Sequence, residues 1–307
     1  MDELGKERLR NAFTGSLPLP SGLERCLKEG LDRVLQNPGS LVRPEIVLQV
    51  GLEYGLSEPD ATNLAIGLEY FHTASLLFDD LPSMDDAVER RGEPCVHVEY
   101  GDAAAILSAL ALVNRAYALT WRAVSNSLPA RQAEALAYVE RNLGVHGLLH
   151  GQSMDLHYSS LPHCRQTVEQ IAIGKTVSLI RLTLVLPAIL GGAPIGELRV
   201  LERIALYWGL SYQIVDDLKD VLQDASESGK TGSRDLSLDR PNIVLILGVD
   251  GAARRLARLI DLGDRMLRRL VASRPKLRFL QALRTELGEE ALRLMRNVCD
   301  REVGEAA

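Results

Sequence analysis

Apolar residues recur at spacings of three and four along nearly the whole chain, and this periodicity constrains the fold more than any other feature of the sequence. It is clear in LERCLKEGLDRVLQ and in ARRLARLIDLGDRMLRRLV, whereas alternating runs of β-branched residues are scarce. Breaks rich in Pro and Gly separate roughly ten helices, some of them about 25 residues or about 37 Å long. The pattern predicts an all-α chain of long helices.

Composition limits the classes of function that remain open. No stretch of the 307 residues resembles a linker, so a single domain, 1–307, is expected. The formal net charge of -6 gives no general attraction to nucleic acid or to an anionic membrane. Four scattered cysteines argue against a zinc site and a disulfide framework, and they fit a reducing cytoplasm. The segment Val177–Ile195 is the most apolar, but it contains Arg181 and Pro187 and is expected to be a buried helix, not a membrane span.

Four aspartates and two arginines follow one apolar run, in SLLFDDLPSMDDAVERRG. If that run is helical, His72, Ser75 and Asp79 lie on one face, at steps of three and four. Pro82 then ends the helix and lets the chain bring Asp85 back toward Asp79. Taken alone, this cluster is equally well explained as the solvated end of a helix.

A second acidic cluster, YQIVDDLKDVLQD, strengthens the functional interpretation. Asp216 and Asp220 are one helical turn apart, and Gln213 lies about one turn before them. Carboxylates at this density repel one another unless cations lie between them. All-oxygen ligands suit Mg²⁺, which usually completes its coordination with water and substrate phosphates. The two clusters therefore predict a metal-dependent diphosphate site, if they face each other across a helical bundle.

Lysine is rare in the chain, and two of its six lysines lie in Gly-Lys-Thr sequences. Lys175 and Lys230 are both expected at breaks, where a basic group can reach an anion. Either lysine is also compatible with a solvated loop. A GKT sequence without the upstream glycine is not a phosphate-binding P-loop.

Taken in order, these segments resemble the trans-isoprenyl diphosphate synthases, the family that contains the farnesyl and geranylgeranyl diphosphate synthases, over nearly the whole chain. DDLPSMDDAVERRG resembles the first aspartate-rich motif and YQIVDDLKD the second. GQSMD, GKT at Gly174 and GKTGSRD resemble further motifs that lie between and after them. The resemblance puts six aspartates in metal positions: Asp79, Asp80, Asp85, Asp216, Asp217 and Asp220.

The resemblance implies a single-domain bundle of long helices around a deep apolar cavity, usually as a homodimer. It also implies a Mg²⁺-dependent prenyltransferase that binds three Mg²⁺ ions together with the allylic diphosphate. Metal ions and basic residues neutralise the leaving diphosphate, so that an allylic carbocation forms. C4 of isopentenyl diphosphate attacks this cation, and a proton is then lost.

The resemblance assigns the remaining site residues by position. Residues expected to hold the allylic diphosphate are Arg90, Lys175, Lys230 and Arg240. Catalytic residues are Lys175, Thr176 and Gln213, the last two offering dipoles to the cation. Residues expected to bind isopentenyl diphosphate are Arg43, His72 and Arg91.

Two segments depart from the family pattern. One is SALALV, from Ser108, where the family commonly has a Gly-Asp pair, and the other is PGSLVRP. In PGSLVRP, Ser40 stands where the family has a lysine for isopentenyl diphosphate, and Leu41 replaces the neighbouring arginine. The loss of one charge-assisted contact, at about 1.5 to 3 kcal/mol, is expected to weaken the binding of that substrate roughly ten- to a hundredfold. Three hypotheses stay open: an elongating prenyltransferase, a cyclase or lyase that ionises a prenyl diphosphate alone, and a non-catalytic partner subunit. The intact acidic clusters argue against the third.

Product length is predicted from the helix that leads into the first cluster. The resemblance puts the wall of the product cavity at Ala74 and Ser75, where relatives that stop at C15 usually carry a bulky aromatic residue. Both side chains are small here, which predicts a C20 or somewhat longer product, geranylgeranyl diphosphate first. The alternative is that both residues serve only close helix packing.

Overall fold

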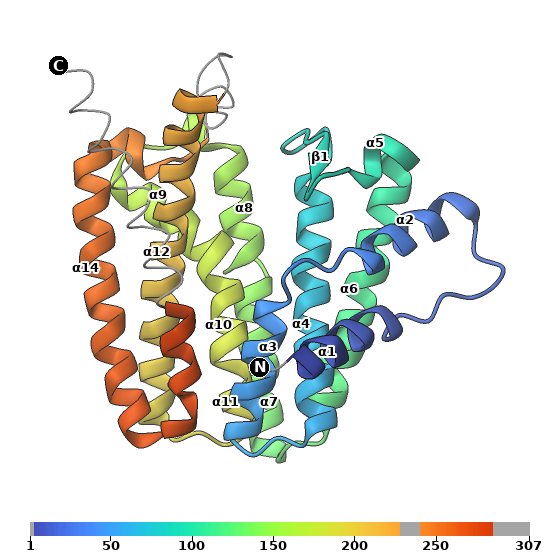
Figure 1. Cartoon of the computed structure of the whole chain (residues 1–307), viewed down its shortest axis with the longest axis horizontal. Helices are drawn as coiled ribbons and strands as arrows, with labels where there is room; N and C mark the ends of the chain where they lie inside the picture. The colour runs from blue at the N-terminus through green and yellow to red at the C-terminus, as the bar shows by residue number, and fades with distance from the viewer. Residues whose placement is uncertain (1–2, 228–239, 285–307) are drawn as a thin grey trace. The chain divides into compact units, whose positions relative to one another are not determined.

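The computed structural model describes residues 3–227 and 240–284, and these are almost entirely helical (Figure 1). The all-α prediction is confirmed. The elements are α1 (Glu3–Gly15), α2 (Arg25–Gln36), α3 (Val42–Glu53), α4 (Glu58–Asp79), β1 (Glu89–Arg90), β2 (Glu93–Pro94), α5 (Val96–Tyr100), α6 (Asp102–Ser125), α7 (Pro129–Leu143), α8 (Leu148–Leu156), η1 (Tyr158–Ser160), α9 (Arg165–Ala172), η2 (Ile173–Val177), α10 (Ser178–Leu184), α11 (Leu186–Leu190), α12 (Ile195–Glu227), α14 (Ile243–Ser273) and η3 (Pro275–Arg278).

The chain divides into two compact units. The first comprises the residues up to Leu136 together with Leu186–Ala193, and the second comprises Ala137–Val185 and the residues from Pro194 onward. The first unit carries the first acidic cluster and the second unit carries the second. A single domain over 1–307 stays a prediction.

Helix α4 is the central helix of the first unit. It begins after Ser57, whose hydroxyl accepts a hydrogen bond from the backbone N–H of Asp60 at 3.2 Å, and Pro59 occupies its first turn. It packs against α3 and lies beside α6 (Figure 1). A Cβ on Gly67 would lie 2.8 Å from the hydroxyl of Thr120 on α6, so glycine allows the two helices to approach closely. Because α4 is packed on several sides, its position is well defined up to the first acidic cluster.

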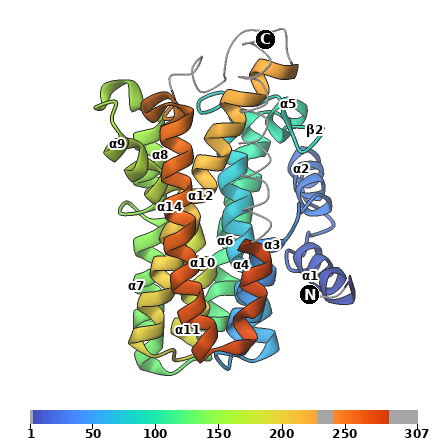
Figure 2. The same cartoon turned by 60° about the vertical axis from the view of Figure 1, so that its left-hand side comes forward.

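The second unit is organised around two long helices, α12 and α14, which run side by side (Figure 2). Helices α8, α9 and α10 join them through the π-helical turn η2. A Cβ on Gly174 of this turn would lie 2.6 Å from the Cα of Gly151 on α8. Lys175 was expected at a chain break, and this detail is wrong. The chain stays helical there but widens to a π turn, a feature frequent at functional sites.

The most apolar segment is buried, as the sequence predicted, but it is not one helix. It forms α10 and α11, which end at Leu190, and every residue of 182–190 is buried. Two described stretches, α6 and Arg165–Leu190, are long and apolar enough to cross a membrane by length and composition alone. Core helices meet the same criteria, and 61% of the second window is buried, so this is weak evidence for a span.

Candidate active site

The first acidic cluster starts where α4 ends. After Asp79 the chain turns back, and the backbone N–H of Asp85 donates a hydrogen bond to the carbonyl of Asp79 at 2.9 Å. A second bond, from the N–H of Ala87 to the carbonyl of Asp80 at 3.2 Å, closes the same turn. The return of Asp85 that was predicted from Pro82 is thus confirmed for the backbone.

Asp80, the second aspartate of this cluster, is buried and bound to Arg90. Asp80 is only 3% exposed, and both of its carboxylate oxygens accept hydrogen bonds from Nε of Arg90, at 2.7 and 2.9 Å. Burial lowers the pKa of Arg90. The hydrogen bond with Asp80 and the charges of Asp80 and Asp79 together raise it by more, so the pKa of Arg90 lies above its usual value. A residue predicted to bind metal and a residue predicted to bind diphosphate therefore bind each other.

Arg91, predicted to bind isopentenyl diphosphate, lies against the loop between α2 and α3. Its Nη1 donates to the carbonyl of Asn37 at 3.0 Å. Gly39 has a φ of +72°, and a Cβ there would lie 2.6 Å from Cζ of Arg91. Glycine is required at this position by the backbone and by the guanidinium group together.

The rest of this loop carries the departure from the family pattern. Arg43 lies in the first turn of α3 and is half-buried. Ser40 is exposed, whereas Leu41 is buried and adopts a left-handed φ of 54° as the N-cap of α3. The leucine side chain therefore contributes to the core of the first unit.

On α4, His72 is 9% exposed. Burial, then the charges of Arg43, Arg91 and Arg90, lower the pKa of His72 to about 2, so its imidazole is neutral at physiological pH. Ser75 donates from Oγ to the carbonyl of His72 at 2.8 Å.

The two positions predicted to set product length differ in burial. Ala74 is fully buried and Ser75 is half-buried. Their role in product length stays a prediction.

In the second unit, Lys175 and Arg240 meet on one carboxylate. Nζ of Lys175 donates to Oδ2 of Asp155 at 2.9 Å, and Nη1 of Arg240 lies 3.6 Å from the same oxygen. Asp155 was not among the predicted site residues. The available signal was its place as the last residue of GQSMD. The carboxylate keeps both basic groups together.

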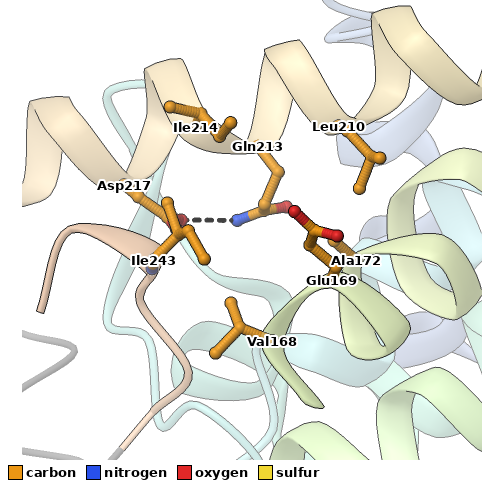
Figure 3. Close-up of a pocket in the computed structure, with 8 residues that line it drawn as sticks. All are labelled: Val168, Glu169, Ala172, Leu210, Gln213, Ile214, Asp217 and Ile243. Carbon is orange, nitrogen blue, oxygen red and sulfur yellow. Dashed lines mark hydrogen bonds between the residues drawn. The ribbon is translucent and has the colours of Figure 1, made fainter. Parts of the chain in front are cut away.

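Thr176, Gln213 and Asp217 form a hydrogen-bonded chain. The hydroxyl of Thr176 donates to Oε1 of Gln213 at 2.8 Å, and Nε2 of Gln213 donates to Oδ1 of Asp217 at 2.9 Å. The other oxygen of Asp217 accepts the backbone N–H of Ile243 at 2.7 Å. Asp217 is 2% exposed and borders a small pocket between α9, α12 and the start of α14 (Figure 3). It thereby binds the positive N-terminal end of α14 and fixes the orientation of the Gln213 amide.

The other aspartates of the two clusters are more accessible. Asp216 is exposed, and Asp79, Asp85 and Asp220 are half-buried. Within the described residues, no three of His, Cys, Asp and Glu lie close enough to hold a metal ion by themselves. The donors are all oxygens, which suits Mg²⁺ when substrate phosphates complete its coordination. Lys230 lies outside the described residues.

The sequence matches the polyprenyl synthetase family model over residues 24–266. It is 34% identical over 271 residues to a geranylgeranyl diphosphate synthase of Pseudescherichia vulneris, covering 86% of this chain and 85% of that protein. It is 35% identical over 222 residues to a chloroplastic geranylgeranyl pyrophosphate synthase of Capsicum annuum. That match covers 72% of this chain and spans 60% of the length of the Capsicum protein.

A solved structure gives the same result for the fold. Geranyltransferase from Helicobacter pylori, complexed with magnesium and isoprenyl diphosphate, aligns with a TM-score of 0.75 and 26% identity. The alignment covers 96% of this chain and 95% of that one. With the fold, the family model and the sequence relatives in agreement, the chain belongs to the polyprenyl synthetase family, the trans-isoprenyl diphosphate synthases.

Proposed function

We propose that the chain is a Mg²⁺-dependent prenyltransferase that condenses an allylic prenyl diphosphate with isopentenyl diphosphate. The observation that carries the proposal is the π turn η2, on which Lys175 and Thr176 are adjacent and separately anchored. The ammonium group is bound to Asp155 and the hydroxyl to Gln213. A cation and an oriented dipole side by side suit a reaction in which a diphosphate leaves and a carbocation forms.

The proposed mechanism assigns separate tasks to these two groups. Lys175 and Arg240, held together by Asp155, attract the allylic diphosphate and stabilise its negative charge as it leaves. The side-chain oxygen atoms of Thr176 and Gln213 are the negative ends of their dipoles, and they stabilise the resulting cation. C4 of isopentenyl diphosphate attacks C1 of that cation, a carbon–carbon bond forms, and the proton lost from C2 passes to the departed diphosphate.

We propose that the metal ions are held by the more accessible aspartates: Asp79, Asp85, Asp216 and Asp220. When bound, three Mg²⁺ ions would neutralise the leaving diphosphate. The contacts of Asp80 with Arg90, and of Asp217 with Gln213 and the N–H of Ile243, compete with direct binding of a metal ion.

A product of C20 or somewhat longer, with geranylgeranyl diphosphate first, is proposed from Ala74 and Ser75. Ala74 is fully buried on α4, so a larger side chain there must displace its neighbours. Ala74→Phe should shorten the product toward C15 at a cost of about 1 to 3 kcal/mol in stability from overpacking. Chromatography of the dephosphorylated products decides the point. A wild-type enzyme that already stops at C15, or a variant whose products are no shorter, contradicts it.

The second candidate is a cyclase or lyase that needs no isopentenyl diphosphate. The observation that favours it is the loop before α3, where Ser40 is exposed and Leu41 is buried, so neither offers a basic group. Incubation with Mg²⁺, farnesyl diphosphate and labelled isopentenyl diphosphate separates the candidates. A longer labelled diphosphate supports the transferase, and an unlabelled hydrocarbon or alcohol supports the cyclase. No product from either substrate supports a non-catalytic partner subunit.

We also propose a cytoplasmic homodimer. Four apolar side chains recur at steps of three, seven and four on α6, and each is about half exposed: Leu107, Leu110, Tyr117 and Trp121. A stripe of this kind suits burial against a second copy of the chain. Light scattering should give twice the chain mass for the wild type and a smaller mass for Trp121→Glu. A monomeric wild type contradicts this proposal without affecting the proposed reaction.

A further inference from the structure

His97 is a buried histidine on the short helix α5, and it contacts the turn that carries the first acidic cluster. It is 9% exposed, and its Nε2 lies 2.8 Å from the backbone carbonyl of Ala87. Because a carbonyl oxygen can only accept, Nε2 carries the proton and donates this hydrogen bond. The N–H of Cys95 donates to the next carbonyl, that of Val88, at 3.0 Å. His97 was not among the predicted site residues, yet it binds the backbone two residues after Asp85.

The backbone of Ala87 helps to close the acidic turn. Its N–H donates to the carbonyl of Asp80 at 3.2 Å, and the N–H of Asp85 donates to the carbonyl of Asp79 at 2.9 Å. Between these two donors, Asp86 adopts a left-handed φ of 48°, a conformation that is costly unless the surrounding structure holds it. The hydrogen bonds of Ala87 are therefore part of what sets the position of Asp85 relative to Asp79.

His97 is itself fixed from the side away from the turn. Helix α5 packs on α2 and on α6. Arg33 of α2 donates from Nη2 to the carboxylate of Glu99 on α5 at 2.5 Å. Nδ1 of His97 lies 3.8 Å from Oδ1 of Asp102, at the start of α6. The imidazole thus connects the acidic turn to a packed part of the first unit.

We propose that His97 is a positioning residue for the metal site, whose Nε2–H holds the carbonyl of Ala87 and thereby fixes the separation of Asp79 and Asp85. The inference rests on the proposed function, in which these two half-buried aspartates hold Mg²⁺. Mg²⁺ requires nearly ideal octahedral geometry, so its affinity is sensitive to where each carboxylate lies. His97 acts through the backbone and contacts neither the metal ions nor the diphosphate.

Backbone exchange tests the first step without any ligand. His97→Leu removes the donor, so the N–H groups of Asp85 and Ala87 should exchange with deuterium about tenfold faster than in the wild type. His97→Gln keeps an N–H donor on a side chain of similar reach, and its exchange should stay within about threefold of wild type. Mass spectrometry of a fragment that contains both residues measures the rates. Equal exchange in the wild type and His97→Leu overturns the proposal, as does a His97→Gln variant that exchanges as fast as His97→Leu.

Mg²⁺ affinity tests the second step. In calorimetric titrations with pyrophosphate present, His97→Leu should bind Mg²⁺ about tenfold more weakly than the wild type, and His97→Gln within about threefold of it. Pyrophosphate affinity without Mg²⁺ should stay within about twofold in both variants, because the basic residues are unchanged. An unchanged Mg²⁺ affinity in His97→Leu overturns the proposal. An equal fall in the two affinities also overturns it, because the loss would then not be specific to the metal site.

Tyr70→Phe is the matched control for a general loss of stability. Tyr70 lies in the same unit and is fully buried, and its hydroxyl donates to the carbonyl of Phe13. This substitution therefore also removes a buried side-chain donor from a backbone carbonyl, but at α1 and not at the acidic turn. Tyr70→Phe and His97→Leu should both unfold a few degrees below the wild type. Tyr70→Phe should keep wild-type exchange in the turn and Mg²⁺ affinity within about twofold, and an equal loss of Mg²⁺ affinity in both variants overturns the proposal.

These measurements separate the role of His97 from the proposed reaction. If the wild type binds Mg²⁺ but forms no elongated product, the proposed condensation fails, and the Mg²⁺ affinities still decide the role of His97. If the wild type elongates its substrate and His97→Leu keeps full Mg²⁺ affinity, the inference fails and the proposed reaction stands. A wild type that binds no Mg²⁺ in the presence of pyrophosphate contradicts both.

Discussion

Asp80 of the first acidic cluster and Asp217 of the second are both buried, but they are stabilised in different ways. Asp80 is paired with a cation, the guanidinium group of Arg90. Asp217 accepts hydrogen bonds from neutral groups, the amide of Gln213 and the backbone N–H of Ile243. Each aspartate is the second of an Asp-Asp pair. Asp80 binds an arginine ten residues further along the same segment, whereas Asp217 on α12 binds the first residue of α14.

The difference has an electrostatic consequence. In the first cluster one carboxylate is neutralised by an arginine of its own motif, so Arg90 is less available to an added diphosphate. In the second, Asp217 accepts hydrogen bonds from the Gln213 amide and the N–H of Ile243, and Lys175 and Arg240 both contact Asp155. The comparison predicts that neighbouring aspartates within one motif differ in function and in their contribution to stability.

The largest effect is expected at Asp216. Asp216→Asn should lower turnover by about 10³-fold, or about 4 kcal/mol, because a carboxylate proposed to hold Mg²⁺ is lost. Since Asp216 is exposed, the unfolding temperature should stay within a degree or two of wild type. Asp250→Asn, at another exposed acid of the second unit, is the control and should keep full activity. A variant at Asp216 that keeps more than a tenth of the activity would remove it from the site.

Next in size is Asp80→Asn. It leaves the half-buried Arg90 with a neutral partner, and should lower the free energy of unfolding by about 2 kcal/mol, less than for a fully buried pair because Arg90 is partly solvated. Unfolding in urea measures this fall in the free energy of unfolding. Adding Arg90→Met should recover part of the loss, since no unpaired charge remains. A double variant less stable than Asp80→Asn alone would contradict the pairing.

Asp217→Asn should behave differently. An asparagine can still accept the N–H of Ile243, and its amide can donate to Gln213 if the Gln213 amide turns over. The hydrogen bonds are then kept, and we expect a loss of only about 1 kcal/mol in stability. The reversed amide presents the wrong dipole next to Thr176, so turnover should fall about tenfold. A loss of stability as large as that of Asp80→Asn would erase the difference between the two aspartates.

The smallest effect is expected beside the first cluster, where Arg91 is proposed to bind isopentenyl diphosphate. Ser40→Lys should lower the KM for this substrate up to tenfold by restoring one charge-assisted contact, at about 1.4 kcal/mol. The allylic KM should not change, and initial rates with each substrate varied in turn measure both. An unchanged KM for isopentenyl diphosphate would mean that Ser40 does not face it.

The features that the sequence predicted depend on local patterns. Helix periodicity and breaks at Pro and Gly predicted the helices, and Pro82 predicted the return of Asp85 toward Asp79. The partners of Asp217 could not be predicted in this way, because the N–H of Ile243 lies 26 residues away and reaches it only when α14 packs on α12.

The π turn at Lys175 was missed because it depends on a contact between two helices. The π turn arises where Gly174 meets Gly151 of another helix, a contact that no local pattern contains. Residue types were therefore predictable from the motifs, whereas their partners required the tertiary structure.

Binding of Mg²⁺ in the presence of pyrophosphate tests the division between aspartates most directly. Calorimetric titration of Asp79→Asn and Asp216→Asn should give at least tenfold weaker Mg²⁺ binding than wild type, because each variant loses a proposed ligand. Asp80→Asn and Asp217→Asn should bind Mg²⁺ within about threefold of wild type. Equal losses in all four variants, or larger losses at the two buried aspartates, would contradict the account.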